Sequence, residues 1–183
     1  MADARIACRI CRAKGETPMN CRTDKSMYAP NETVCVYVDD LPAETVSLRL
    51  ILSHLEKTVL TEEIAAAERF SLLPPAKDGK GYLLEVQALD PDKALLAGAF
   101  TAIDVSSAWT RFPRYGYVWD FTPGVDAQAK IETLCRFHIN GLQFYDWQDE
   151  HDKPLAGTRE EPAEKWQDIA KRDVYAKTVS GYI

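Results

Sequence analysis

The sequence predicts an immunoglobulin-like β-sandwich followed by the first βαβα part of an incomplete (β/α)8 TIM barrel. Two patterns lead to this prediction. Apolar residues alternate with polar ones in several short runs between residues 22 and 105, and a strand, helix, strand order follows. A complete barrel needs about 250 residues, whereas the chain has 183. We therefore expect an irregular segment at 1–21, a sandwich at 22–105 and a truncated barrel start at 106–183.

Alternation with a period of two defines the predicted sandwich. Antiparallel strands with one buried face show this period, and "YAPNE" and "DGKG" supply residues suited to tight turns. The stretch "EEIAAAERF" is helix-prone and could form a short helix between strands, so its structure stays open. The predicted inward face consists of Val34, Val36, Val38, Val46, Leu48, Leu50, Leu52, Tyr82, Leu84, Val86, Ala88, Ala99, Thr101, Ile103 and Val105.

The pattern changes after Val105. "SSAWTRFPRYG" is predicted to connect the domains, and "YGYVWDF" to form a short strand. A helix is expected to begin at residues 122–124 or at Asp126 and to end at Asn140-Gly141, residues that tolerate left-handed backbone. The apolar stripe of this helix would be Ile131, Leu134, Cys135 and His138.

The next predicted strand is "LQFYDW", whose nearly continuous apolar character is typical of buried parallel strands. A long polar loop follows. Pro162 is then expected to begin a helix that contains Trp166 and Ile169. Asp173 would cap another helix that continues to Ile183.

Charge and composition argue against several classes of partner. The net charge of −6 and the pI near 5.1 do not fit nucleic-acid binding. No window approaches the ~20 apolar residues of a membrane span. The first residues place arginines where a signal peptide needs an apolar core, so we expect no export signal in this chain.

Cysteine usage leaves two readings of the N-terminal segment. The chain has five cysteines, and an odd number in a chain of this size argues against a disulfide framework. Cys8, Cys11 and Cys21 could supply three thiolate ligands to zinc. No fourth ligand lies nearby at the usual spacing, so free thiols in an irregular terminus are the favoured reading.

Polar and aromatic residues follow both predicted parallel strands. Asp120 comes after the first, and Tyr145, Asp146, Trp147 and Gln148 come at the end of the second. Parallel strands present their carboxyl ends at one rim, where ligands of such domains bind. Carboxylates accept hydrogen bonds from sugar hydroxyls, and aromatic rings pack against sugar C–H groups. The sequence therefore predicts a carbohydrate-binding rim.

Other residues near this rim have simpler explanations. Trp119 and Phe121 are expected to pack in a core or between domains, and the acidic stretch after Gln148 to form a solvated loop. The chain contains no glycine-rich phosphate loop, nucleophile elbow or His-x-x-x-His motif. We therefore expect no cofactor and no metal site at the rim.

Two long segments carry a family resemblance. "DVSSAWTRFPRYGYVWDF" and "LCRFHINGLQFYDWQDEHDKPLAGT" closely resemble the region that joins sandwich and barrel in glycoside hydrolase family 66. That family comprises endo-dextranases and cycloisomaltooligosaccharide glucanotransferases. Similarity extends outward through "TDKSMYAPNETV", "LLPPAKDGKGYLLEV" and "WQDIAKRDVYAKTVSGYI", so it spans about residues 22–183.

The resemblance implies a retaining enzyme that acts on α-1,6-linked glucan such as dextran and isomaltooligosaccharides. Its aspartate nucleophile and glutamic acid would lie on later barrel strands. No catalytic residue is therefore assigned here, and the chain is expected to be an N-terminal fragment that is inactive alone. By motif position, Asp120 and residues 145–148 would line sugar subsites beside the cleavage point. The resemblance also implies an extracellular or cell-surface location.

A second hypothesis stays open. The sandwich could be a stand-alone module that binds polysaccharide or a protein partner, with the α/β segment as a remnant. Within the family reading, the sequence does not distinguish hydrolysis from cyclising transglycosylation.

Overall fold

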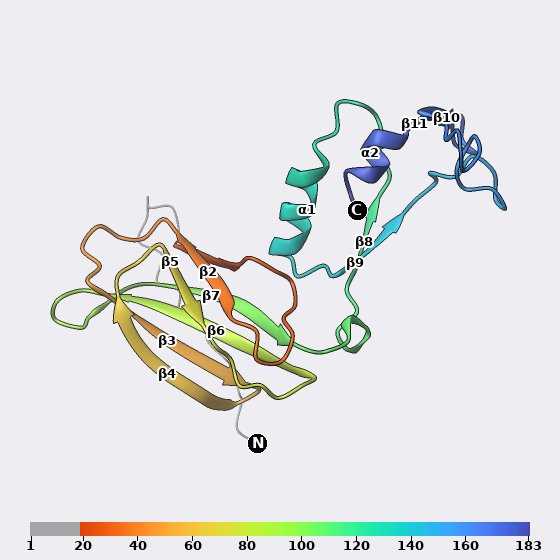
Figure 1. Cartoon of the computed structure of the whole chain (residues 1–183). Coiled ribbons are helices and arrows are strands. Elements are labelled where there is room, and N and C mark those ends of the chain that lie inside the picture. The colour runs from red at the N-terminus through yellow and green to blue at the C-terminus, as the bar shows by residue number, and fades with distance from the viewer. Residues whose placement is uncertain (1–18) are drawn as a thin grey trace, which may run out of the picture. The chain divides into compact units, whose positions relative to one another are not determined.

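The computed structural model describes residues 19–183, which form two compact units. Unit 1 contains residues 19–24 and 28–107, and unit 2 contains residues 25–27 and 108–183 (Figure 1). Cys8 and Cys11 lie outside the described residues. No helix in the described part of the chain is long and apolar enough to cross a membrane.

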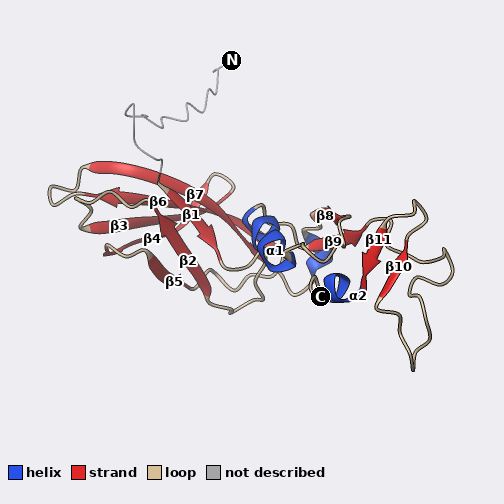
Figure 2. Ribbon diagram, turned by 90° about the horizontal axis from the view of Figure 1, so that it is seen from above, coloured by secondary structure: helices blue, strands red, loops and turns tan. Residues whose placement is uncertain are grey.

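Unit 1 is built from two antiparallel sheets, drawn as red ribbons in Figure 2. One sheet has the strand order β1-β2-β5 and the other has the order β4-β3-β6-β7. The strands are β1 (Asn20–Thr23), β2 (Val34–Asp39), β3 (Ser47–His54), β4 (Lys57–Ala65), β5 (Arg69–Leu72), β6 (Lys80–Leu89) and β7 (Leu95–Val105). This two-sheet arrangement fits the predicted sandwich, and the immunoglobulin-type topology stays a prediction.

The two sheets share one hydrophobic core. The predicted inward residues of β2, β3, β6 and β7 are all buried in it, because successive side chains of a strand point to opposite faces. Val46 is the exception. It is 46% exposed because it precedes β3, which begins at Ser47.

The helix-prone stretch "EEIAAAERF" is strand for most of its length. Glu62 pairs with Leu50 and Ile64 with Leu48 in the β3–β4 ladder, and Ile64 packs against the core. Glu63 accepts a hydrogen bond from Lys93 on the solvent side. Cross-strand pairing outweighs the intrinsic helix propensity of these residues.

The sandwich begins slightly earlier than predicted. Strand β1 starts at Asn20, inside the segment expected to be irregular. Cys21 lies in the core, and burial raises the pKa of its thiol to about 12. A neutral buried thiol suits packing rather than the thiolate chemistry of a zinc ligand.

Unit 2 begins with the predicted strand, helix, strand sequence. Strands β8 (Tyr115–Val118) and β9 (Gly141–Phe144) pair in parallel, with helix α1 (Ala127–Arg136) between them in the chain. A Cβ atom built on Gly116 would lie 2.9 Å from Ile139 and 3.2 Å from Leu134, so helix and sheet approach closely here. These three elements form one βαβ unit, and the (β/α)8 barrel stays a prediction.

Helix α1 begins where predicted but ends earlier than predicted. Asp126 caps the helix, because its Oδ1 accepts a hydrogen bond from the Ala129 amide at 3.0 Å. The helix ends at Arg136, before the expected stop at Asn140-Gly141. His138, with a φ of 56°, takes the left-handed backbone, so it lies beyond the helical stripe. The Asn140 side chain instead donates to Phe112 O and accepts from Arg114 N.

The first predicted helix after Pro162 is wrong, and the second is shorter than predicted. Residues Lys165–Gln167 form β10 and Asp173–Tyr175 form β11, an antiparallel pair, and the short helix α2 covers only Ala176–Ser180. The buried residues Trp166 and Val174 face each other across this pair. Asp173 pairs with Gln167 in the ladder and caps no helix.

Candidate carbohydrate-binding rim

The predicted site residues leave the parallel sheet at one end. Val118 is the partner of Phe144 at the last paired position of β8 and β9. The Tyr145 amide then donates to Val118 O at 2.8 Å. Asp120 and residues 145–148 therefore follow the carboxyl ends of adjacent parallel strands. We name these five residues the rim.

Asp120 is anchored by the turn that follows it. Its Oδ1 accepts hydrogen bonds from the Thr122 hydroxyl at 2.8 Å and the Thr122 amide at 3.2 Å. Partial burial acts to raise the pKa of Asp120, but these hydrogen bonds and the charge of Lys130 outweigh it and lower the pKa. Asp120 is therefore an ionised hydrogen-bond acceptor near neutral pH.

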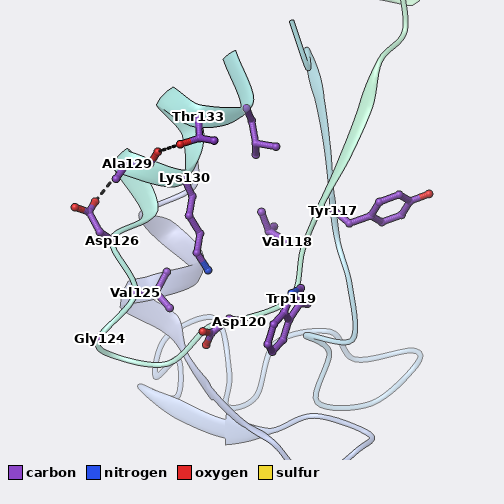
Figure 3. Close-up of a pocket in the computed structure, with 11 residues that line it drawn as sticks. Tyr117, Val118, Trp119, Asp120, Gly124, Val125, Asp126, Ala129, Lys130 and Thr133 are labelled. Atoms are coloured by element: carbon purple, nitrogen blue, oxygen red, sulfur yellow. Dashed lines mark hydrogen bonds between the residues drawn. The ribbon is translucent and has the colours of Figure 1, made fainter. Parts of the chain in front are cut away.

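A hollow of about 590 Å³ lies beside Asp120, between the end of β8 and helix α1 (Figure 3). Figure 3 shows the Lys130 side chain and the Trp119 ring at this hollow. Residues 145–148 do not line it. The structure thus brings both segments to one end of the sheet, but only Asp120 of the rim lies in the hollow.

The outer face of β8 is aromatic and exposed. Tyr115, Tyr117 and Trp119 are 56%, 62% and 61% exposed. Gly116 and Val118, at the alternate positions, are buried. Trp119 is therefore not in the core, which was one of the two locations expected for it. Phe121, 2% exposed, is in the core of unit 2.

Asp146 is held by an arginine that the sequence analysis did not identify. Its Oδ2 accepts a hydrogen bond from Arg172 Nη2 at 2.9 Å. The Nε of the same guanidinium donates to Asp168 Oδ2 at 2.7 Å. Asp146 also has left-handed backbone, with a φ of 47°, a region that Asp tolerates better than most residues.

Asp168 is the buried anchor of this cluster. It is 2% exposed, and its Oδ1 accepts hydrogen bonds from the amides of Ala170 and Arg172. Burial acts to raise the pKa of Asp168, but the hydrogen bonds from Arg172 and Ala170 and the arginine charge lower it overall. Asp168 and Arg172 are four residues apart in the chain, and the turn between β10 and β11 brings their side chains together.

The remaining rim residues divide between packing and exposure. The Trp147 ring lies 6.0 Å from that of Phe144 and packs against the core of unit 2. Its carbonyl accepts a hydrogen bond from Trp166 Nε1 at 2.7 Å. Tyr145 is 51% exposed, and Gln148 is half-buried. Tyr145 and the two carboxylates are thus the groups best placed to meet a hydroxylated ligand.

Among residues 19–183, no group of three or more His, Cys, Asp or Glu side chains has the arrangement of a metal site. The rim presents carboxylate hydrogen-bond acceptors and the exposed aromatic ring of Tyr145. These groups can bind a neutral polyhydroxyl ligand.

Comparisons with known proteins identify relatives that are carbohydrate-active enzymes. The family model described as glycosyl hydrolase family 66 matches residues 23–183. Two cycloisomaltooligosaccharide glucanotransferases of Niallia circulans are 33% and 29% identical over 177 residues. These matches cover 88% of this chain but 18% of each relative.

A solved structure is also similar. It is a cycloisomaltooligosaccharide glucanotransferase of Paenibacillus sp. complexed with cycloisomaltoheptaose. The TM-score is 0.77 at 34% identity, and the match covers 92% of this chain and 26% of the other. The chain thus spans a minor part of the length of these relatives.

Proposed function

Because the chain belongs to glycosyl hydrolase family 66, we propose that it forms the N-terminal sandwich and the first part of the catalytic barrel of an enzyme acting on α-1,6-linked glucan. The similarity to a glucanotransferase complexed with cycloisomaltoheptaose, at a TM-score of 0.77, is the main support. In this proposal unit 1 is the immunoglobulin-like domain, and β8, α1 and β9 begin the (β/α)8 barrel.

The rim would bind glucose units beside the cleavage point. Asp120 and Asp146 would accept hydrogen bonds from sugar hydroxyls, and the exposed Tyr145 ring would pack against a pyranose face. Trp147 would orient the rim through its packing. The Gln148 amide would contact sugar hydroxyls and help to orient the sugar, since an amide both donates and accepts hydrogen bonds.

The bond-breaking groups would lie outside residues 1–183. A retaining mechanism needs one carboxylate as nucleophile and one carboxylic acid as proton donor, about 5–5.5 Å apart. The lowered pKa of Asp120 suits an acceptor rather than a proton donor. Asp146 is tied to Arg172. Neither fills the acid role, so we propose that this chain alone binds glucan without cleaving it.

Binding and cleavage are tested separately on the 183-residue chain. NMR titration with isomaltoheptaose should shift the amide signals of residues 145–148, and maltoheptaose, which has α-1,4 links, should shift them less. Asp146→Asn should weaken the response. Lys165→Gln is the matched control, because it breaks the exposed Lys165–Asp173 ion pair of the neighbouring hairpin.

Each result has a defined meaning. Release of isomaltose-type products from dextran by the purified chain contradicts the proposed absence of catalytic groups. Shifts confined to residues 19–107 contradict the rim and favour the stand-alone polysaccharide-binding module. The choice between hydrolysis and cyclisation stays open, and the extracellular location stays a prediction.

A further inference from the structure

We propose that Arg172, itself fixed by Asp168, is a positioning residue that holds the Asp146 carboxylate in its glucan-binding orientation. This inference rests on the proposed function of the rim. Neither Arg172 nor Asp168 belongs to the rim, and both come from the hairpin formed by β10 and β11. The proposal therefore assigns a functional role to a hairpin outside the two parallel strands.

The guanidinium group joins two carboxylates. Arg172 donates through Nη2 to Asp146 Oδ2 at 2.9 Å and through Nε to Asp168 Oδ2 at 2.7 Å. The planar guanidinium presents its donors in a fixed fork, so orienting one donor orients the other. The position of Asp168 therefore determines where the Asp146 carboxylate is held.

Asp168 is a rigid base for this bridge. Its side chain is 1% exposed, whereas those of Arg172 and Asp146 are 41% and 26% exposed. Two backbone amides hold Oδ1 at 2.8 and 2.9 Å, and the Lys171 amide donates to the Asp168 carbonyl at 2.9 Å. The hairpin turn and the arginine are thus fixed by the same residue.

Asp146 keeps part of its capacity for a ligand. Within the described residues, Arg172 is the recorded hydrogen-bond partner of this carboxylate, through Oδ2 alone. Oδ1 can therefore accept from a sugar hydroxyl. The cluster of two carboxylates and one guanidinium retains a net charge of −1, which favours contact with donors. Left-handed backbone at Asp146 places the carboxylate at the end of β9, where Arg172 reaches it.

A double-mutant cycle tests whether Arg172 acts through Asp146. The variants are Asp146→Asn, Arg172→Gln and the pair, with Lys165→Gln as the matched control. We expect Arg172→Gln to raise the Kd for isomaltoheptaose about tenfold. It should add no further loss in the Asp146→Asn background. Lys165→Gln should leave the Kd unchanged.

A second readout does not depend on glucan. The 13Cα and 13Cβ shifts of Asp146 report its backbone and carboxylate environment, and Arg172→Gln should move them. Arg172→Lys, which keeps the charge but lacks the fork, should move them too. This conservative variant provides the test if the glutamine variant does not fold.

The outcomes separate the two proposals. An equal loss of affinity from Arg172→Gln in both backgrounds overturns the positioning role. Unchanged Asp146 shifts in both Arg172 variants overturn it as well. If the parent chain binds no isomaltoheptaose, the proposed function fails. Moved shifts would still support the Arg172–Asp146 link.

Discussion

Phe121 should control the stability of unit 2 without affecting unit 1. Its side chain is 2% exposed, stacked on Phe144 at 5.8 Å and set edge-on to Tyr182 at 6.1 Å. Phe-to-Ala changes in cores cost about 3–5 kcal/mol, and the two lost ring pairs support at least the middle of this range, about 4 kcal/mol. A loss of that size should lower the Tm of so small a unit by at least about 15 °C.

The four tryptophans make the assay specific. Trp109, Trp119, Trp147 and Trp166 all lie in unit 2, so tryptophan fluorescence follows that unit. Far-UV circular dichroism also follows the strands of unit 1. Phe121→Ala should therefore lower the fluorescence midpoint and leave a second, unshifted transition in the dichroism signal.

A matched core variant provides the control. Leu84 is 0% exposed in the core of unit 1. Leu84→Ala should cost about 2–5 kcal/mol and shift the dichroism transition alone. The reasoning is refuted if Phe121→Ala shifts both signals together, or if its fluorescence midpoint falls by less than about 4 °C, the equivalent of about 1 kcal/mol.

Three further predictions concern the open sheet, acid and the cysteines. Limited proteolysis should cut residues 115–183 before unit 1, because β8 and β9 have unpaired edges; equal resistance on both sides of Pro113 would contradict this. Acid should destabilise unit 2. The folded pKa of Asp168 is below its ordinary value of 3.8, so its stabilisation is present above that value and disappears as the pH falls through the folded pKa. Asp168→Asn should flatten the fall in fluorescence midpoint below about pH 5, and an unchanged slope would count against the anchor. Iodoacetamide at neutral pH should modify Cys35, which is half-buried, before Cys21, whose pKa is raised to about 12; peptide mass mapping that finds equal rates would be inconsistent with a buried Cys21.

Alternation predicted unit 1 well because each of its sheets has one buried face. A period of two in Val34, Val36 and Val38 then reports burial directly, and all three are at most 2% exposed. Intrinsic propensity left the structure of "EEIAAAERF" open, and pairing with β3 decides it. The strand, helix, strand order after Val105 was also readable, since α1 has both an apolar stripe and an Asp cap.

The helix prediction after Pro162 was incorrect for a different physical reason. The apolar residues of this segment are sparse, and the expected first helix depended on Pro162, Trp166 and Ile169 alone. In the structure the Asp168 carboxylate collects two amides and a guanidinium, and this makes a turn. The sequence also provided no indication of the hydrogen-bond partner of Asp146. Arg172 is 26 residues away in the chain, and only the tertiary fold brings the two together.

Strand β8 has apolar or aromatic residues on both faces, as strands covered from two sides do. The face with Gly116 and Val118 is buried, while Tyr115, Tyr117 and Trp119 are exposed to solvent. Such a row of solvent-exposed aromatic side chains should promote self-association of the isolated polypeptide. Concentrated solutions of the chain should scatter light. The chain should also be retained on a hydrophobic resin and increase the fluorescence of the dye ANS, and its tendency to self-associate will set the concentration at which it can be studied.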